Sequence, residues 1–203
     1  MNKKYGLKDL REKRLKISRI MELNDPFEFL GADLSDREFR EAMEATKKEL
    51  AKTKGVICFS KKWTNPVQWT HYADRHKGIC IGFDVPDNLL VKVDYVSERL
   101  PVKGKITEKT MLTFLTTKFI HWKYEQEYRA FLSLDEEEND FYYADFSENL
   151  KLKQVIVGAH STITRAEVNE AVGDIITEIE VFKARAAFRK FEIVRNKNEK
   201  LWA

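Results

Sequence analysis

The chain has 203 residues, and its 36 basic and 33 acidic side chains give a formal net charge of +3. This length suits a single domain. Because basic and acidic side chains nearly balance, the charge does not require nucleic acid as a partner. Because 43% of the residues are hydrophobic and 12% aromatic, with only four prolines and eight glycines, the composition predicts a sizeable core and excludes extended disorder.

The lack of a recognisable targeting signal and the placement of the two cysteines predict a cytoplasmic protein. No apolar run approaches the ~20 residues needed to cross a bilayer, and no apolar segment follows the charged opening "MNKKYGLKDLREKRLK" as in a secretory signal. Cys58 and Cys80 lie inside apolar runs, which predicts buried free thiols in a reducing compartment. Their separation excludes a zinc finger, and no metal site is assigned.

The first elements in chain order are a helix, a short strand over 15–20 and the turn "ELNDPFEF". A helix is expected over 35–52, where Ser35 and Glu38 have the spacing of a capping box, and Gly55 is expected to end it. The short apolar stretch "VICFS" then predicts a buried strand.

A second helix is expected over 66–77, because Asn65 is a good N-cap, Pro66 suits the first helical position and Gly78 is a good stop. Strands are expected over 79–85 and 89–96.

The next segments are a helix over 108–124 and a strand over 127–134. Strands over 141–146 and 152–159 follow, and a long final helix opens with a capping box of Thr164 and Glu167. A strand closes the chain in "FEIVRN".

Strands and helices alternate without a regular βαβ rhythm. The pattern therefore predicts an α+β fold with a mixed or antiparallel central sheet and flanking helices. We expect residues 1–203 to form a single domain, in which the strand–helix–strand segment 151–203 packs on the rest.

The stretch "ELNDPFEFL" at residues 22–30 raises the question of a buried carboxylate. Asn24 and Asp25 can bond to their own backbone, and Pro26 disfavours helix before it, so a turn needs no functional explanation. Glu28, however, lies between two phenylalanines, and a carboxylate among apolar neighbours needs a partner or a raised pKa.

We expect the turn to present Glu28 inward as one wall of a polar pocket. Arg129 and His76 are the candidate partners, although the sequence does not place them in space.

The stretch "KFIHWKYEQEYRAF" contains a second group of charged residues, among them two glutamates and an arginine. If a strand begins at Glu125, then Glu125, Glu127 and Arg129 alternate onto one side. The alternatives are an exposed sheet face with a Glu127–Arg129 ion pair, or a continued helix in which Lys118, Trp122, Glu125 and Arg129 share a stripe. The functional interpretation is a carboxylate pair at the mouth of a cleft, with Arg129 keeping one member ionised.

In the helix expected over 66–77, Trp69, Tyr72, Ala73 and His76 fall at i, i+3, i+4 and i+7, and so share one face. Such an aromatic stripe is more typical of a core than of a site. His76 lies at its end, where it could pair with a carboxylate or a ligand.

Four blocks, "LNDPFE", "ICFS", "QWTHYADRHKGICIGFD" and "KFIHWKYEQEYR", follow one another over about residues 5–160. In order and spacing they resemble a prokaryotic family known as domain of unknown function 2971, whose name carries no activity. Only "KKYG" stands where family members usually have a Tyr-Lys-Tyr strand. The resemblance implies one shared pocket and marks these positions: Asn24, Asp25, Pro26, Glu28, Ser60, Trp69, Tyr72, His76, Gly78, Trp122, Glu125, Glu127 and Arg129.

The order of a Ser-ending strand and a later Glu-Gln-Glu stretch is also similar to that of ADP-ribosyltransferases, which cleave NAD. In this interpretation Glu127 stabilises the oxocarbenium-like cation and Glu125 polarises the acceptor. Tyr72 or Trp69 would stack on nicotinamide, and Arg129 would hold a phosphate or orient the glutamates. No NAD-binding residue is identified on the first strand.

Two alternatives remain open, and the sequence leaves the oligomeric state undetermined. One is a metal-dependent nuclease or phosphoesterase that uses Asp25, Glu28, His76 and Glu125 as ligands, although no local metal spacing supports it. The other is a non-enzymatic module that binds a nucleotide or peptide in a phage-defence or stress system. The chain lacks a phosphate-binding P-loop, a GxGxxG fingerprint, HExxH and a GxSxG elbow.

Overall fold

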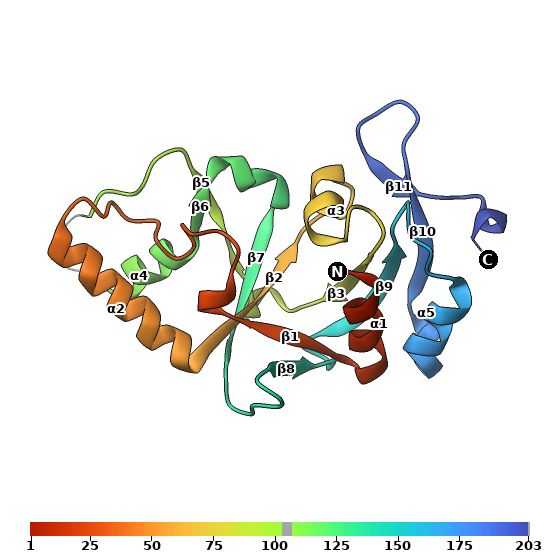
Figure 1. The fold of residues 1–203 in the computed structure, drawn as a ribbon, viewed down its shortest axis with the longest axis horizontal. Helices are drawn as coiled ribbons and strands as arrows, with labels where there is room; N and C mark the ends of the chain where they lie inside the picture. The colour runs from red at the N-terminus through yellow and green to blue at the C-terminus, as the bar shows by residue number, and fades with distance from the viewer. Residues whose placement is uncertain (103–106, 203) are drawn as a thin grey trace. The chain divides into compact units, whose positions relative to one another are not determined.

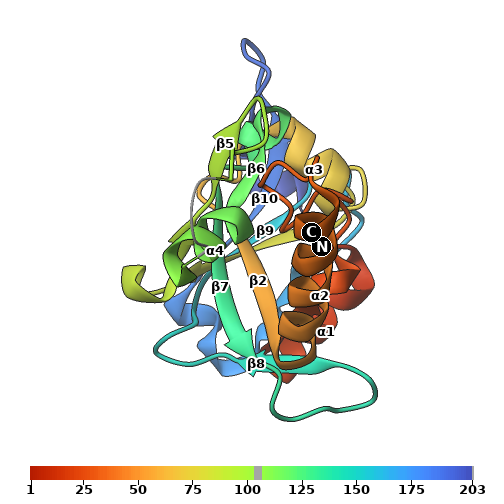
Figure 2. The same ribbon diagram turned by 90° about the vertical axis from the view of Figure 1, so that its left-hand side faces the viewer.

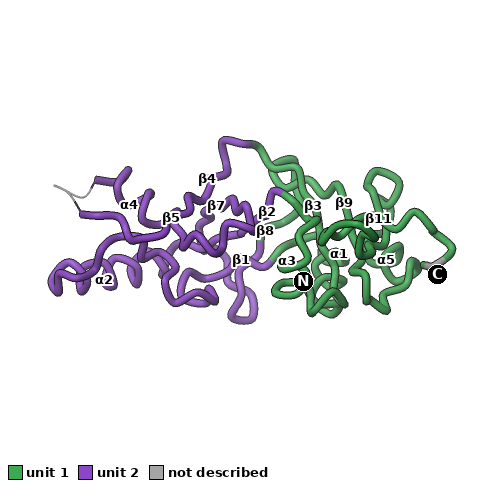
Figure 3. Tube along the Cα trace, turned by 90° about the horizontal axis from the view of Figure 1, so that it is seen from above, with its two compact units in different colours: residues 1–15, 62–86, 144–203 green, residues 16–61, 87–143 purple. Residues whose placement is uncertain are grey.

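The computed structural model describes residues 1–102 and 107–202 (Figure 1). The α+β class, with an antiparallel sheet, a mixed sheet and flanking helices, is confirmed. Two compact units divide the chain (Figure 3), unit 1 comprising residues 1–15, 62–86 and 144–203, and unit 2 comprising residues 16–61 and 87–143. The chain passes between the units four times, so neither unit is a continuous segment.

Unit 1 contains a mixed four-stranded sheet in the order β11-β10-β9-β3, in which only β9 and β10 run parallel. Its strands are β3 (Ile79–Asp84), β9 (Lys151–Val157), β10 (Glu180–Ala186) and β11 (Ile193–Arg195). Its helices are α1 (Lys3–Glu12), α3 (Pro66–Tyr72) and α5 (Arg165–Val172), with the 3-10 turns η4 (Gly173–Glu178) and η5 (Glu199–Leu201).

Both faces of the unit 1 sheet are covered, which explains the buried apolar run Val155–Val157 at the end of β9. Val155 and Val157 point to one face, where they pack in a core with Leu10 of α1 and Val168 of α5. Ile156 points to the other face and packs in a second core that includes residues of α3 and β10.

Unit 2 is built around a five-stranded sheet in the order β4-β7-β2-β1-β8. These strands are β1 (Arg14–Arg19), β2 (Lys54–Ser60), β4 (Val91–Lys92), β7 (Glu127–Ser133) and β8 (Tyr142–Asp145). The chain passes between the units within β1 and within β8. In Figure 2, β2 and β7 run side by side, in agreement with their antiparallel pairing.

A parallel two-stranded ladder and two helices complete unit 2. The ladder consists of β5 (Asp94–Val96) and β6 (Thr117–Phe119), and the helices are α2 (Arg37–Thr53) and α4 (Glu108–Leu115). Three 3-10 turns connect these elements: η1 (Ile20–Glu22), η2 (Asp87–Leu89) and η3 (Ile120–Glu125).

The ends of α2 differ from the prediction. Asp36, not Ser35, is the N-cap, and its carboxylate accepts a hydrogen bond from the Phe39 N–H at 2.8 Å. Gly55 does not end the helix, because α2 stops at Thr53 and the chain enters β2 directly. Gly55 instead lies where a Cβ would come within 2.5 Å of the Ile17 side chain, so strand packing explains this glycine.

Helix α3 is shorter than expected, although its Asn65 cap and Pro66 start are confirmed. It ends at Tyr72, and the next turn holds Asp74, Arg75 and His76 in the left-handed region, at φ 47, 54 and 69°. Each of these non-glycine residues carries a conformational cost of about 1–2 kcal/mol. The prediction that His76 continues the helical stripe is therefore wrong.

Helix α4 ends at Leu115 instead of continuing to residue 124. The Thr116 and Thr117 hydroxyls donate to the carbonyls of Leu112 and Thr113 at 2.8 and 2.7 Å. Both threonines are also β-branched, which lowers their helix propensity. The chain then forms β6 and η3, so Glu125 lies on a 3-10 turn. The strand expected over 127–134 begins at Glu127 as predicted, and the alternative in which it begins at Glu125 is wrong.

The capping box of Thr164 and Glu167 is confirmed, but the long final helix is wrong. Helix α5 has eight residues and is followed at Gly173, where φ is +67°, by a 3-10 turn. Strand β10, which the sequence analysis did not predict, occupies much of the remaining length.

Among the residues that the structure describes, no helix combines the length and the apolar character required to span a bilayer.

A test of the packing in unit 1 is the substitution Gly158→Ala. A Cβ at this position would overlap the carbonyl oxygen of His76 and lie 2.9 Å from that of Gly78, and backbone atoms cannot move aside cheaply. We expect the free energy of unfolding, measured by urea denaturation, to fall by about 1–3 kcal/mol.

Gly82→Ala is the matched control, because the nearest atom to its new Cβ would be the side-chain Cβ of Gln154 at 3.1 Å. Its loss of stability should be smaller. Equal losses in the two variants would contradict the packing described for Gly158.

Candidate functional site

Strands β2 and β7 bring polar side chains from distant parts of unit 2 onto one face. Their antiparallel register pairs Ser60 with Glu127 and Cys58 with Arg129. Directly opposed residues in such a ladder project to the same face, and so do alternate residues of one strand. Ser60, Cys58, Glu127 and Arg129 therefore share one face of the sheet.

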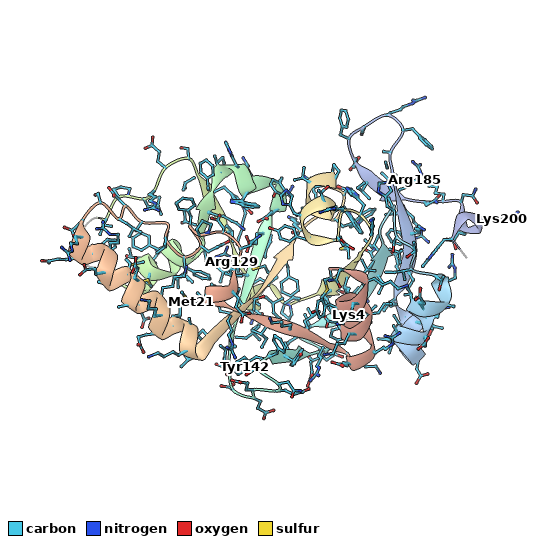
Figure 4. All side chains as sticks on the ribbon, in the orientation of Figure 1. Lys4, Met21, Arg129, Tyr142, Arg185 and Lys200 are labelled. Carbon is cyan, nitrogen blue, oxygen red and sulfur yellow. The ribbon has the colours of Figure 1, made fainter. Side chains whose placement is uncertain are left out.

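Arg129 has no exposed surface, and each nitrogen of its guanidinium donates a hydrogen bond. Nε donates to Glu127 Oε1 at 2.7 Å, Nη2 to Glu28 Oε2 at 2.6 Å, and Nη1 to the Leu115 carbonyl at 2.8 Å. The guanidinium also lies 5.1 Å from the ring centroid of Phe29, within cation–π distance. Figure 4 labels Arg129 among the side chains of the protein.

Lys118 of β6 is the second buried cation, and three carboxylates surround its ammonium group. Nζ lies 2.7 Å from Glu125 Oε2, 3.0 Å from Glu127 Oε2 and 3.1 Å from Glu28 Oε1. The centroid of the Trp122 ring is 4.9 Å from the same nitrogen. The ammonium thus joins three segments of unit 2.

We call Glu28, Lys118, Glu125, Glu127 and Arg129 the buried ion cluster, since none is more than 7% exposed. Its three carboxylates and two cations leave a formal charge of −1. Burial by itself would raise the pKa of Glu127, but Arg129 and Lys118 outweigh it and lower that pKa to about 2. Burial likewise opposes the charge of both cations, whose pKa values the glutamates nevertheless raise.

The turn at residues 24–29 holds Glu28 in this cluster. The Asp25 side chain accepts a hydrogen bond from the Phe27 N–H at 2.9 Å, and the Glu28 N–H donates to the Asp25 carbonyl at 3.0 Å. Phe29 adopts a left-handed φ of 63°, and both Glu28 and Phe29 are buried. Phe27, in contrast, is 57% exposed.

The other candidate residues of unit 2 differ in exposure. Asn24 and Ser60 are exposed, and Trp122 is half-buried. The Glu127 backbone N–H donates to the Tyr95 hydroxyl at 2.8 Å. Burial is the main cause that raises the pKa of Tyr95 to about 12, so this phenol stays protonated at neutral pH.

Cys58 differs from the expected buried thiol, because it is exposed, and Cys80 is only half-buried.

Trp69, Tyr72 and His76 belong to unit 1. Trp69 is buried, and its indole N–H donates to the Trp63 carbonyl at 2.6 Å. The His76 ring stacks on Trp69 with centroids 6.4 Å apart, and lies 5.6 Å from the ring of His160. Tyr72 is 43% exposed. The left-handed turn, rather than a helical face, brings His76 over Trp69.

Sequence reasoning missed the central place of Lys118 and the contact of Tyr95. Lys118 appeared only as part of one alternative helical stripe. The available signal was a lysine beside Phe119 and Ile120, only a few residues before two glutamates. A lysine that is buried with such neighbours requires carboxylate partners.

The carboxylates of the cluster converge on the Lys118 ammonium. Among the described residues, no group of three or more His, Cys, Asp or Glu side chains is arranged to hold a metal ion.

Comparisons of the chain with family models, curated proteins and solved structures found no match. The resemblance drawn from the four motif blocks stays a prediction. Function therefore has to be argued from the geometry of the described side chains.

The substitution Lys118→Ala tests the role of the buried ammonium. It would leave three buried carboxylates with Arg129 as their only cation within the cluster, and removal of one partner from a buried ion pair is strongly destabilising. We expect the free energy of unfolding, from urea denaturation, to fall by about 3–5 kcal/mol. The exposed Lys48 of α2 is the control, and Lys48→Ala should change stability by less than about 0.5 kcal/mol. A similar small change for both variants would refute the role of Lys118.

The lowered pKa of Glu127 predicts a specific loss of stability in acid. A carboxyl group whose pKa falls from an ordinary 4.5 to about 2 on folding stabilises the protein above pH 4.5, and this contribution disappears as the pH falls toward 2. In Glu127→Gln, the difference in unfolding free energy between neutral pH and about pH 3 should therefore be smaller than in the wild type. Urea denaturation across this range is the measurement. An unchanged difference would show that Glu127 is not the group responsible.

Proposed function

We propose that the protein is an ADP-ribosyltransferase-like enzyme that uses NAD at the end of β2 and the start of β7. The observation that carries the proposal is the pairing of Ser60 directly with Glu127 in the β2–β7 ladder. The serine that ends the first strand therefore lies directly beside the last glutamate of the Glu-Gln-Glu stretch.

The electrostatics of the buried ion cluster support this chemistry. In the reaction the C1′–N bond of NAD breaks and nicotinamide departs with the bonding electron pair. The acceptor then forms a bond to C1′ and releases a proton to solvent. Positive charge develops on the ribose in the transition state, and fixed negative charge stabilises it. The low pKa of Glu127 keeps this carboxylate ionised at neutral pH.

Each remaining residue has a proposed role that follows from its surroundings. Glu125 would polarise the acceptor, and Arg129 would orient Glu127 and Glu28 through the contacts it already makes.

A second candidate is a binding module without turnover, and one observation favours it. Both carboxylate oxygens of Glu127 already contact Arg129 or Lys118, so the cluster can act as a fixed anionic surface for a nucleotide or peptide.

A role in phage defence or stress is the accompanying proposal. The resemblance to domain of unknown function 2971 and a cytoplasmic location are also proposed. The four motif blocks support the first of these, and the free thiols of Cys58 and Cys80 support the second.

Release of labelled nicotinamide from NAD separates the two candidates. With added proteins and nucleic acids as acceptors, the enzyme should release nicotinamide, whereas a binding module should show only an NAD-dependent rise in melting temperature. Glu127→Gln should abolish the release. Ser60→Ala, which removes an exposed hydroxyl and leaves the buried ion cluster in place, should lower the rate about tenfold.

Ser97→Ala is the matched control for Ser60, since it removes another exposed hydroxyl of unit 2. Melting curves of every variant would show whether a loss of release reflects unfolding. Absence of release from the folded wild-type protein with all acceptors would count decisively against the enzyme.

A further inference from the structure

The loop between β10 and β11 exposes two phenylalanines almost completely. Phe188 is 89% and Phe191 is 102% exposed, whereas the next most exposed large apolar side chain among the described residues, Phe27, is 57% exposed. In Figure 1 this loop extends away from β10 and β11. Since neither ring is buried in the core of unit 1, the fold itself does not explain them, and exposed apolar groups of this kind mark interaction sites.

The two strands hold the loop at a defined position. Ala186 pairs with Ile193 at the end of the antiparallel ladder, and the Ala187 N–H donates to the Glu192 carbonyl at 2.9 Å. Only Phe188–Phe191 extend beyond this last hydrogen bond. The rings are therefore presented on a short, closed hairpin.

Basic side chains are concentrated in the sequence around the two rings, although Arg195 forms ion pairs with Glu180 and Glu199, and Lys183 donates to the Ser161 carbonyl. Residues 183–197 contain six basic side chains and one acidic side chain, although the whole chain is nearly neutral. The Arg185 guanidinium lies 4.2 Å from the ring centroid of Phe188, and Figure 4 labels Arg185 near the base of the loop. Arg189 and Lys190 lie between the rings in sequence, and neither forms an ion pair with any residue that the structure describes.

We infer that this hairpin, residues 183–197, is a binding element for single-stranded nucleic acid. Exposed aromatic rings provide faces on which unpaired bases stack, and neighbouring cations bind the phosphates. Both cations thus lie between the two rings in the sequence, within the same four-residue stretch. The inference is independent of the function proposed for unit 2.

The placement of the charges favours nucleic acid over a lipid surface. If both rings entered a bilayer, Arg189 and Lys190 between them would be drawn toward the hydrocarbon, where cations are unfavourable. A single strand instead offers each ring a base and each cation a phosphate. The positive charge is also local, which is why the balanced total charge does not reveal it.

Fluorescence anisotropy with a fluorescein-labelled single-stranded oligothymidylate tests the inference on the full-length chain. The double variant Phe188→Leu/Phe191→Leu retains apolar side chains but removes the π-faces. We expect it to weaken binding about tenfold or more, because stacking on each ring is lost. Phe27→Leu, which changes an exposed ring of unit 2, should bind like the wild type.

A second pair of variants tests the phosphate contacts. Arg189→Ala/Lys190→Ala should weaken binding and reduce the slope of log affinity against log salt by about 1.4, the value for two contacts to a single strand. Lys48→Ala/Lys109→Ala removes two exposed cations from α2 and α4 and should leave the slope unchanged.

Three outcomes would overturn the inference. One is a folded wild-type protein that does not bind the oligonucleotide in low salt. Another is undiminished binding by Phe188→Leu/Phe191→Leu, which would show that stacking plays no part. The third is binding of phosphatidylserine vesicles, but not of oligonucleotide, by both the wild type and the leucine variant. Because these rings are almost fully exposed, the leucine variant should retain the wild-type melting temperature.

Discussion

Arg129 carries a positive charge in a position with no exposed surface, and much of unit 2 is organised around it. Its guanidinium joins the turn that carries Glu28, the end of α4 at Leu115 and its own strand β7. Lys118 adds η3 through Glu125. Removing an ion from water costs several kcal/mol, and only complete pairing offsets that cost. The five side chains must therefore assemble together, which couples segments that are distant in sequence.

Stability alone is a weak explanation for such a cluster. Well-packed apolar residues of similar volume often stabilise a fold as well as a buried ion pair does, or better. The cluster has one more carboxylate than cations, and its face of the sheet also carries the exposed Ser60 and Cys58. A fixed field at an accessible surface is what recognition or catalysis of a cationic centre requires. The same groups thus serve the fold and the proposed chemistry.

Local sequence patterns predicted most strands and two helix N-caps. They did not predict where helices end or which charged side chains pair with one another. The apolar run of β2 and the caps at Asn65 and Thr164 depend on neighbouring residues, so the sequence displays them. Helix α4 ends where threonine hydroxyls bond back to carbonyls, which helical periodicity does not register. The contact of Glu28 with Arg129 spans 101 positions and depends on the packing of the whole unit. The motif order suggested the residues of the cluster, but only the folded chain identifies Lys118 as its centre.

Because the chain passes repeatedly between the units, unit 2 can complete its fold before unit 1 during translation on the ribosome. All of unit 2 lies before residue 144, so its strands and its ion cluster can form while the rest is still being translated. The sheet of unit 1 must wait, because β3 at Ile79–Asp84 pairs with β9 at Lys151–Val157. During this interval the apolar β3 lacks its native partner and is exposed to misassociation. The nascent protein is thus most vulnerable between synthesis of β3 and emergence of β9.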